Sequence, residues 1–508
     1  MSTKGYIGID AGTQGLSAIF TDESLNVLAT GESSYEMVPG LPEGCYEQRP
    51  EDWESALIGA MQQLRRNYSD EMDVLAIGIS GQMHGEVLAD GDGNSLCPAR
   101  LWCDARNEAE GLELTEALGV KMPKRITAAR WLWTIRNRND IAVRTEQITT
   151  PAGWIAFLLT GQWKLGIGDA AGMFPINQTT LDYDQSLLEK FDLLAGGGSG
   201  SLKPRLPTVK TAGEDGGTLN ANGAAILGLP TGIPVAPAEG DQPAALAGSL
   251  IGDAGLVSCS FGTSVCANSV GDRPFKGVSH AVDHFCAPDG KPINMVWLRN
   301  GTTYMNSVVE MFGQAIGGDR SAGFDSVMPL LLKSDADCGG VMAFPFMDDE
   351  PGVGVARGGT AMLIGLNAEN STPGNVVKAA LLSTMFNLRL GSENLDAQEF
   401  PRTEIILSGG LTRTPELGQI LANVFATPVS LLDSAEEGTA WGAALLAKFR
   451  QEKLYGNSID WENFLKQQPG GYPTRFEPCE SAVPEYERVF QKYKKLIGVH
   501  QSIDAAVH

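Results

Sequence analysis

Two short segments, half a chain apart, share one pattern. Residues 7–14 read IGIDAGTQ and residues 257–264 read VSCSFGTS, so the pairs Gly12-Thr13 and Gly262-Thr263 lie 250 residues apart. Each pair ends an apolar run typical of a β-strand, and a second strand-like run follows it, LSAIF or VCANSV. The shared dipeptide alone is weak, but its place after a strand in each half predicts two duplicated α/β domains facing each other across a cleft.

The length of the chain and a break in its secondary-structure pattern suggest where these domains divide. A chain of 508 residues is too long for one ordinary core. The strand and helix pattern is interrupted at LAGSLIGDAG, residues 246–255. We therefore expect a first domain over residues 1–247, a second over residues 248–450, and a helical tail over residues 451–508.

Composition excludes several classes of partner. Lys and Arg number 38 against 61 Asp and Glu, a formal charge of -23, so we expect neither nucleic acid nor membrane partners. No apolar run approaches the roughly 18 residues of a membrane helix, and MSTKGYIGID shows no signal-peptide core. Eight Cys without a CxxC pair favour reduced thiols and a cytoplasmic protein. The oligomeric state is not fixed by the sequence, which leaves a homodimer open.

Two common nucleotide-binding motifs are missing. No GxxxxGK[ST] segment occurs, which argues against a P-loop. Residues 166–172 and 352–358 come near to GxGxxG, but each has three residues rather than two before the last glycine. Neither begins a βαβ unit, so a dinucleotide-binding fold is not expected.

The glycine turns fit phosphoryl transfer, although each alone also fits an ordinary hairpin. This chemistry needs backbone donors around the phosphates, an acid for Mg²⁺ and an acid that accepts the proton of the attacking hydroxyl. The two Gly-Thr turns could hold phosphates from both sides of a cleft. Asp10 precedes the first turn, whereas Ser260 stands at the equivalent place in the second.

A second acid follows a strand in AEGDQPAALAG. Asp241 comes at the end of the apolar run IPVAPA, and side chains at such strand ends face the crevice where α/β sheets bind ligands. Its alternative role is the N-cap of the helix that follows. His84 and the LWCDAR segment raise a similar choice, because Asp104 and Arg106 could contact a polyol or form a surface ion pair.

Another glycine element lies in EIILSGGLTRTP, where a buried strand runs into Gly409-Gly410. This arrangement lets a flat ring or a phosphate reach the backbone. Thr414 is expected to cap a helix with Pro415 at its first position. Residues 434–437 read SAEE, a capping box for a further helix.

In order and spacing these elements resemble the FGGY family of carbohydrate kinases, in the actin-like (ribonuclease H-like) ATPase superfamily. The resemblance covers residues 4 to 450 and includes GIDAGTQG, ISGQMHG, LWCDAR, EGDQPAALAG, SFGTS, SGGLTRTPELGQILANVF and EEGTAWGAALLA. It implies an α/β fold of two actin-like domains with an interdomain cleft, ATP and Mg²⁺ as cofactors, and a sugar as partner. Within the family, GQMHG followed by LWCDAR is most similar to xylulokinases.

The resemblance also implies residue roles. Asp241 and Asp10 match the catalytic acids, Asp241 as general base, and both would lie beside the metal. The positions implied for ATP are Gly12, Thr13, Gln14, Gly262, Thr263, Gly409 and Gly410. The positions implied for the sugar are Met83, His84, Asp104, Asp241 and Gln242.

The implied reaction is phosphorylation of a ketose, first D-xylulose to D-xylulose 5-phosphate. Residues 344–352 read FPFMDDEPG where xylulokinases carry a GERTP-type segment between the domains, so the sugar could differ. Sedoheptulose, ribulose or another polyol stays an alternative. So do a sugar-binding regulator on the same scaffold and an actin-like ATPase that works on partner proteins.

Overall fold

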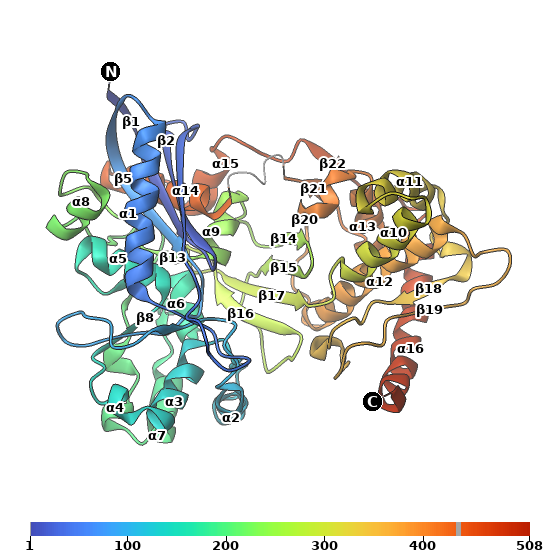
Figure 1. Cartoon of the computed structure of the whole chain (residues 1–508), viewed down its shortest axis with the longest axis horizontal. Helices are drawn as coiled ribbons and strands as arrows, with labels where there is room; N and C mark the ends of the chain where they lie inside the picture. The colour runs from blue at the N-terminus through green and yellow to red at the C-terminus, as the bar shows by residue number, and fades with distance from the viewer. Residues whose placement is uncertain (1, 433–437, 508) are drawn as a thin grey trace.

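Two large mixed sheets form the centres of two α/β domains in this computed structural model, which describes residues 2–432 and 438–507 (Figure 1). The first sheet has the order β13-β5-β1-β2-β3 and the second β16-β17-β15-β14-β20-β21-β22. The strands of the first are β1 (Ser2–Ala11), β2 (Gly15–Asp22), β3 (Val27–Ser34), β5 (Glu71–Gly81) and β13 (Glu239–Gly240). Those of the second are β14 (Leu256–Phe261), β15 (Val265–Val270), β16 (Val282–Cys286), β17 (Pro292–Leu298), β20 (Glu404–Gly409), β21 (Val429–Leu431) and β22 (Thr474–Phe476).

The two sheets repeat one topology. In the first, β1 pairs antiparallel with β2 and parallel with β5, and β5 continues parallel to β13. In the second, β14 pairs antiparallel with β15 and parallel with β20, and β20 continues parallel to β21. The Gly-Thr turns join the matching hairpins β1–β2 and β14–β15. The predicted fold class, two duplicated actin-like domains, is confirmed.

Helices cover these sheets. In the first domain they are α1 (Pro50–Asn67), α2 (Glu108–Leu118), α3 (Thr127–Asn137), α4 (Asn139–Ala142), α5 (Pro151–Thr160), α6 (Ile167–Met173), α7 (Gln185–Leu194), α8 (Ala221–Leu227) and α9 (Asp241–Gly248). Those further along the chain are α10 (Thr303–Ala315), α11 (Arg320–Lys333), α12 (Pro373–Asp396), α13 (Leu417–Phe425), α14 (Gly438–Leu454), α15 (Trp461–Lys466) and α16 (Val483–Val507). Local signals explain α1, which has Pro at its first position, acids in its first turn and two arginines in its last.

One helix from the second half packs against the first sheet. Helix α14 lies on β1 and β5 at backbone contact, because an added Cβ at Gly8 would be 1.9 Å from the Ala440 carbonyl oxygen. A Cβ at Gly442, on α14 itself, would be 1.9 Å from the Ala244 carbonyl oxygen of α9. Glycine at these positions therefore lets α14 enter the groove between β1 and α9. The tail predicted as helical, residues 451–508, also contains a strand, β22, which pairs with β21 at the edge of the second sheet.

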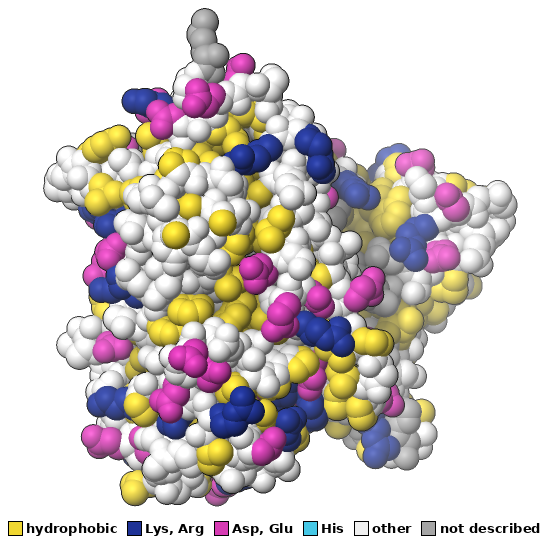
Figure 2. Space-filling view, turned by 60° about the vertical axis from the view of Figure 1, so that its left-hand side comes forward, with side chains coloured by type: hydrophobic (Ala, Val, Ile, Leu, Met, Phe, Trp, Pro, Cys, Tyr) yellow, Lys and Arg dark blue, Asp and Glu magenta, His cyan; other side chains and the backbone are white. Residues whose placement is uncertain are grey.

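Apolar side chains also join the two halves. One buried cluster combines first-domain residues such as Met83 and Leu246 with Phe285 and Met295 from β16 and β17. Outside the core, Lys and Arg side chains stand among Asp and Glu side chains on the face shown in Figure 2. Within residues 2–432 and 438–507, none of the helices combines the length and apolar character required to cross a membrane.

Two expected helix starts have different outcomes. Thr414 does not cap a helix, because residues Gly410–Arg413 form a 3-10 turn, η5, and α13 begins only at Leu417. The Thr412 hydroxyl donates to the Gly409 carbonyl at 2.8 Å and stabilises this turn. The predicted capping box over residues 434–437 lies outside the described residues.

We expect Gly442→Ala to destabilise the protein by about 1–3 kcal/mol, because the new methyl group overlaps the backbone of α9. Gly498→Ala is the matched control, since it lies in α16 with no atom within 4 Å of the added Cβ. Its stability should stay unchanged or rise by up to about 1 kcal/mol, because Ala is the better helix former. Chemical denaturation measures both, and equal midpoints for Gly442→Ala and the unmodified protein would contradict this packing.

Candidate active site

Three parallel strands of the first sheet end side by side at the cleft. Asp10 is in register with Ser80, which is in register with Glu239. One residue further, Gly81 stands between Ala11 and Gly240. With strands spaced about 4.8 Å apart, Asp10 lies two strand spacings from Glu239, and Asp241 follows Glu239 by two residues at the same end of the sheet.

Asp241 is the first residue of α9 and faces this edge. The N-cap of that helix is Gly240, so the capping role left open for Asp241 does not apply. The carboxylate accepts hydrogen bonds from the backbone N–H groups of Gln242 and Met83. Burial, and then the negative charge of Asp10, raise the pKa of Asp241 to about 7. A carboxylate of this basicity is suited to accept a proton near neutral pH.

Asp10 shares a strand face with Gly8, the face that α14 covers. Its Oδ1 is buried and has no hydrogen-bond partner among the described residues. Burial raises the pKa of Asp10, while hydrogen bonds with the side chains of Thr439, at the start of α14, and of Ser80, on β5, oppose this shift. The first half thus supplies the acid and one partner, and a helix of the second half supplies the other.

These two acids fit Mg²⁺ by their chemistry. Oxygen ligands suit this ion, which commonly takes one or two carboxylates together with substrate phosphates and water. The unpartnered oxygen of Asp10 and the nearby Asp241 match that donor set. Among the described residues, no group of three or more His, Cys, Asp and Glu side chains could hold a metal without such a substrate.

The first Gly-Thr turn is held from its carbonyl side. Tyr35 donates its hydroxyl to the Gly12 carbonyl, and the Gln48 Nε2 donates to the Thr13 carbonyl at 2.7 Å. The Trp102 Nε1 donates to the Thr13 hydroxyl oxygen at 3.2 Å. These contacts fix the turn. The Gly12 N–H donates to the Gly15 carbonyl at 3.0 Å, so the N–H groups of Thr13 and Gln14 are the donors of this turn that could meet a phosphate.

The second Gly-Thr turn is held by the start of α10. Thr302 donates to the Gly262 carbonyl from its backbone N–H at 2.8 Å and from its hydroxyl at 2.9 Å. The Gly301 N–H donates to the Thr263 carbonyl at 2.9 Å. Both Gly-Thr turns therefore have their carbonyl oxygens bound to the protein.

The unusual segment over residues 344–352 supports this second turn. Buried Glu350 accepts a hydrogen bond from the Asn300 N–H at 2.9 Å, and the Asn300 Nδ2 donates to the Asp348 carbonyl at 3.0 Å. Asn300 directly precedes the Gly301-Thr302 pair. These contacts attach the segment to the second domain, next to the second Gly-Thr turn.

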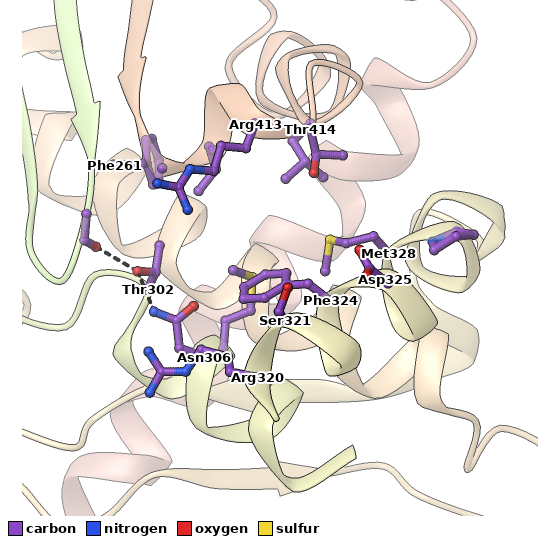
Figure 3. A pocket seen from close by; sticks show the side chains of 16 residues that line it. Phe261, Thr302, Asn306, Arg320, Ser321, Phe324, Asp325, Met328, Arg413 and Thr414 are labelled. Atoms are coloured by element: carbon purple, nitrogen blue, oxygen red, sulfur yellow. Dashed lines mark hydrogen bonds between the residues drawn. The ribbon is translucent and has the colours of Figure 1, made fainter. Parts of the chain in front are cut away.

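A cavity of about 680 Å³ opens beside the second turn (Figure 3). Gly262 and Gly410 line the cavity. The residue before Gly410, Gly409, has φ +85°, and a Cβ added to it would be 2.6 Å from the Phe261 carbonyl oxygen. Its apolar walls suit a flat ring and its polar side chains suit ribose and phosphates. The apolar lining comprises Phe261, Met305, Phe324, Met328, Pro329, Leu411 and Leu417. The polar lining comprises Thr302, Asn306, Arg320, Ser321, Asp325, Arg413 and Thr414.

His84 has a left-handed backbone, φ +67°, at the end of β5. Burial, and then the positive charge of Arg125, lower the pKa of His84 to about 3, so the ring is neutral. Its Nδ1 lies 3.0 Å from the Gly172 carbonyl. Because a carbonyl only accepts, Nδ1 carries the proton and Nε2 is a hydrogen-bond acceptor. An acceptor of this kind suits a sugar hydroxyl.

His84 also lines a second cavity, of about 210 Å³, between the two domains. Here Lys121 Nζ lies 2.7 Å from Asp283 Oδ1 of β16, and Arg125 pairs with the same carboxylate. The three charged side chains line the cavity and join the domains across it. Ion pairs shielded from water in this way are far less screened than surface pairs.

The structure places the other expected sugar contacts differently. Asp104 is fully buried and bound by Arg106 and by the Tyr46 N–H at 2.9 Å, so the ion pair foreseen for it is internal. Met83 is buried, and its backbone rather than its side chain meets Asp241. Gln242 reaches the second domain, where the Asn268 Nδ2 donates to its Oε1 at 3.1 Å.

Several site residues were missed by sequence reasoning. Thr302 and Asn306 follow an Asn-Gly pair, a turn signal that could have marked a ligand-facing helix start. Arg125, Asp283 and Thr439 carry no local signal, because their partners come from the other half of the chain.

Comparison with known proteins agrees with this architecture. The family model "FGGY family of carbohydrate kinases, N-terminal domain" matches residues 5–248, and the C-terminal domain model matches residues 257–450. A xylulose kinase of Haemophilus influenzae is 25% identical, covering 96% of this chain and 98% of that protein.

Solved structures share the fold. A xylulose kinase from Rhodospirillum rubrum has a TM-score of 0.84 at 20% identity, covering 98% of this chain and 99% of that one. A gluconate kinase from Lactobacillus acidophilus has a TM-score of 0.81 at 18% identity and covers all of both chains, 100% each. At such identities the likeness shows the fold alone. The two family models cover most of the chain, and it therefore belongs to the FGGY family of carbohydrate kinases, which are ATP-dependent sugar kinases.

Proposed function

We propose that this kinase transfers the γ-phosphoryl group of ATP to a hydroxyl of D-xylulose, giving D-xylulose 5-phosphate, with Asp241 as the general base. The observation that carries the proposal is the pair of acids at the cleft edge, with the pKa of Asp241 raised to about 7. Xylulose kinases among the relatives support the sugar.

The proposed arrangement assigns the two domains different tasks. The second domain would hold the adenosine in the 680 Å³ cavity, and the turns at Gly12 and Gly262 would donate to the phosphates from both sides. Asp10, with Asp241, would hold the Mg²⁺ that offsets phosphate charge. The hydroxyl of the sugar would donate its proton to Asp241 while Nε2 of His84 accepts from another hydroxyl.

The same proposal extends to the cellular setting. All eight cysteines are free thiols, and the proposed phosphoryl donor, ATP with Mg²⁺, is found in the cytoplasm. We therefore place the protein in the cytoplasm. Sugar and ATP are its proposed small-molecule partners. Sedimentation of the purified protein would test the homodimer left open by the sequence.

Asp241→Asn should reduce kcat by roughly 10²–10⁴-fold, because the amide cannot accept the proton. Binding of ADP without Mg²⁺, measured by calorimetry, should be unchanged, since the nucleotide cavity does not include this residue. Exposed Asp92→Asn is the matched control and should keep full activity. A kcat near that of the unmodified enzyme would exclude Asp241 as the base.

His84→Asn should raise KM for D-xylulose about 10-fold through loss of the Nε2 acceptor. Asn tolerates the left-handed backbone and keeps a side-chain amide for the Gly172 carbonyl, so the local fold should persist. His280→Asn, an exposed site, is the control. The affinity for ADP should not change in either variant. An unaltered KM would show that the sugar does not use this ring.

A coupled ADP-release assay over ketopentoses, ketoheptoses and polyols tests the substrate itself. D-xylulose should give the highest kcat/KM, and sedoheptulose or ribulose in its place would redirect the proposal within the same reaction. Sugar binding without ADP release would favour a regulator. ATP turnover that ignores every sugar would favour an actin-like ATPase.

A further inference from the structure

Neither glycine turn carries a basic residue. The segments 6–22 and 256–270, which contain both turns and the parts of the flanking strands next to them, contain neither Lys nor Arg. Phosphoryl transfer places several negative charges in one site, and kinases and NTPases of other folds supply Lys or Arg there in addition to Mg²⁺. A cation that meets the nucleotide phosphates in this chain must therefore come from elsewhere in the fold.

The nucleotide cavity offers two candidates. Among its described lining residues, Arg320 and Arg413 are the basic side chains. Arg320 Nη2 lies 2.8 Å from Glu310 Oε2, so its charge is already paired. Arg413 forms no ion pair with any carboxylate of residues 2–432 and 438–507. Among the described residues that line this cavity, its guanidinium is therefore the positive charge left for a ligand.

Arg413 lies at the end of the cavity next to the second Gly-Thr turn (Figure 3). It is the last residue of η5, the turn that begins at Gly410. Figure 3 shows its guanidinium extending from η5 over the cavity toward Phe261, on the opposite side from Asp325 and Met328. Phe261 directly precedes the second Gly-Thr turn.

The chemistry of a guanidinium fits this position. It stays charged, presents several N–H donors in one plane and matches two phosphate oxygens at once, which an ammonium does not. We propose that Arg413 binds the polyphosphate chain of the bound nucleotide, supplying from the second domain the positive charge that both glycine turns lack. This inference rests on the proposed function, because it takes the cavity to be the ATP site.

Calorimetric titration with ADP and with adenosine tests the role without any sugar or turnover. Arg413→Gln should weaken ADP binding about 10- to 100-fold and change adenosine binding less than about 2-fold, because only ADP carries the phosphates. Arg413→Lys should recover part of the loss as a point charge. Exposed Arg66→Gln, in α1 and outside this cavity, is the control and should leave the affinities for ADP and adenosine unchanged.

Two results would overturn the inference: equal weakening of adenosine and ADP in Arg413→Gln, which would place the side chain on the base or ribose, or unchanged ADP binding. Retained adenosine binding in the variant also shows that the cavity is folded. If the unmodified protein binds ADP more tightly than adenosine through Arg413 yet phosphorylates none of the sugars, the inference stands and the proposed function fails. If the protein phosphorylates D-xylulose while Arg413→Gln binds ADP normally, the proposed function stands and the inference about Arg413 fails.

Discussion

The site depends on the glycine-mediated contact of α14 with β1, β5 and α9. Backbone meets backbone there because Gly8 and Gly442 have no Cβ. Since α9 begins at Asp241 and α14 brings Thr439 to Asp10, this one contact adjoins both acids, whose separation follows from the register of β1, β5 and β13. Interiors this tightly packed transmit small volume changes, so a methyl group in the groove would also move the acids.

The same helix ties the two halves of the chain together. In sequence it lies between β21 and β22 of the second sheet, yet it packs on the first sheet, which gives the duplicated domains a shared element beside the cleft. The apolar cluster around Met83 and Phe285 and the pairing of Lys121 and Arg125 with Asp283 add contacts at the acceptor side. Closure of such a site excludes water, which favours transfer to a sugar over hydrolysis.

The two Gly-Thr turns are alike in topology but differ in support. Side chains of the first domain hold the turn at Gly12, whereas the start of α10, braced by Glu350 through Asn300, holds the turn at Gly262. The segment that departs from the xylulokinase pattern thus contacts the support of the second turn and not that of the first.

Local patterns determined much of this protein. Strand periodicity, the repeated Gly-Thr turns and the acid after a strand were enough to predict two duplicated α/β domains and to single out Asp10 and Asp241 as candidates, because each signal lies within one short segment. The actin-like fold class came from the resemblance to the family. The helix start expected at Thr414 failed where a 3-10 turn competed locally. Tertiary packing alone decided the partners: Thr439 beside Asp10, Asp283 beside Arg125, Arg413 over the nucleotide cavity and the internal pairing of Asp104. Those contacts join residues distant in the chain, and their geometry follows from how helices and sheets pack rather than from any local propensity.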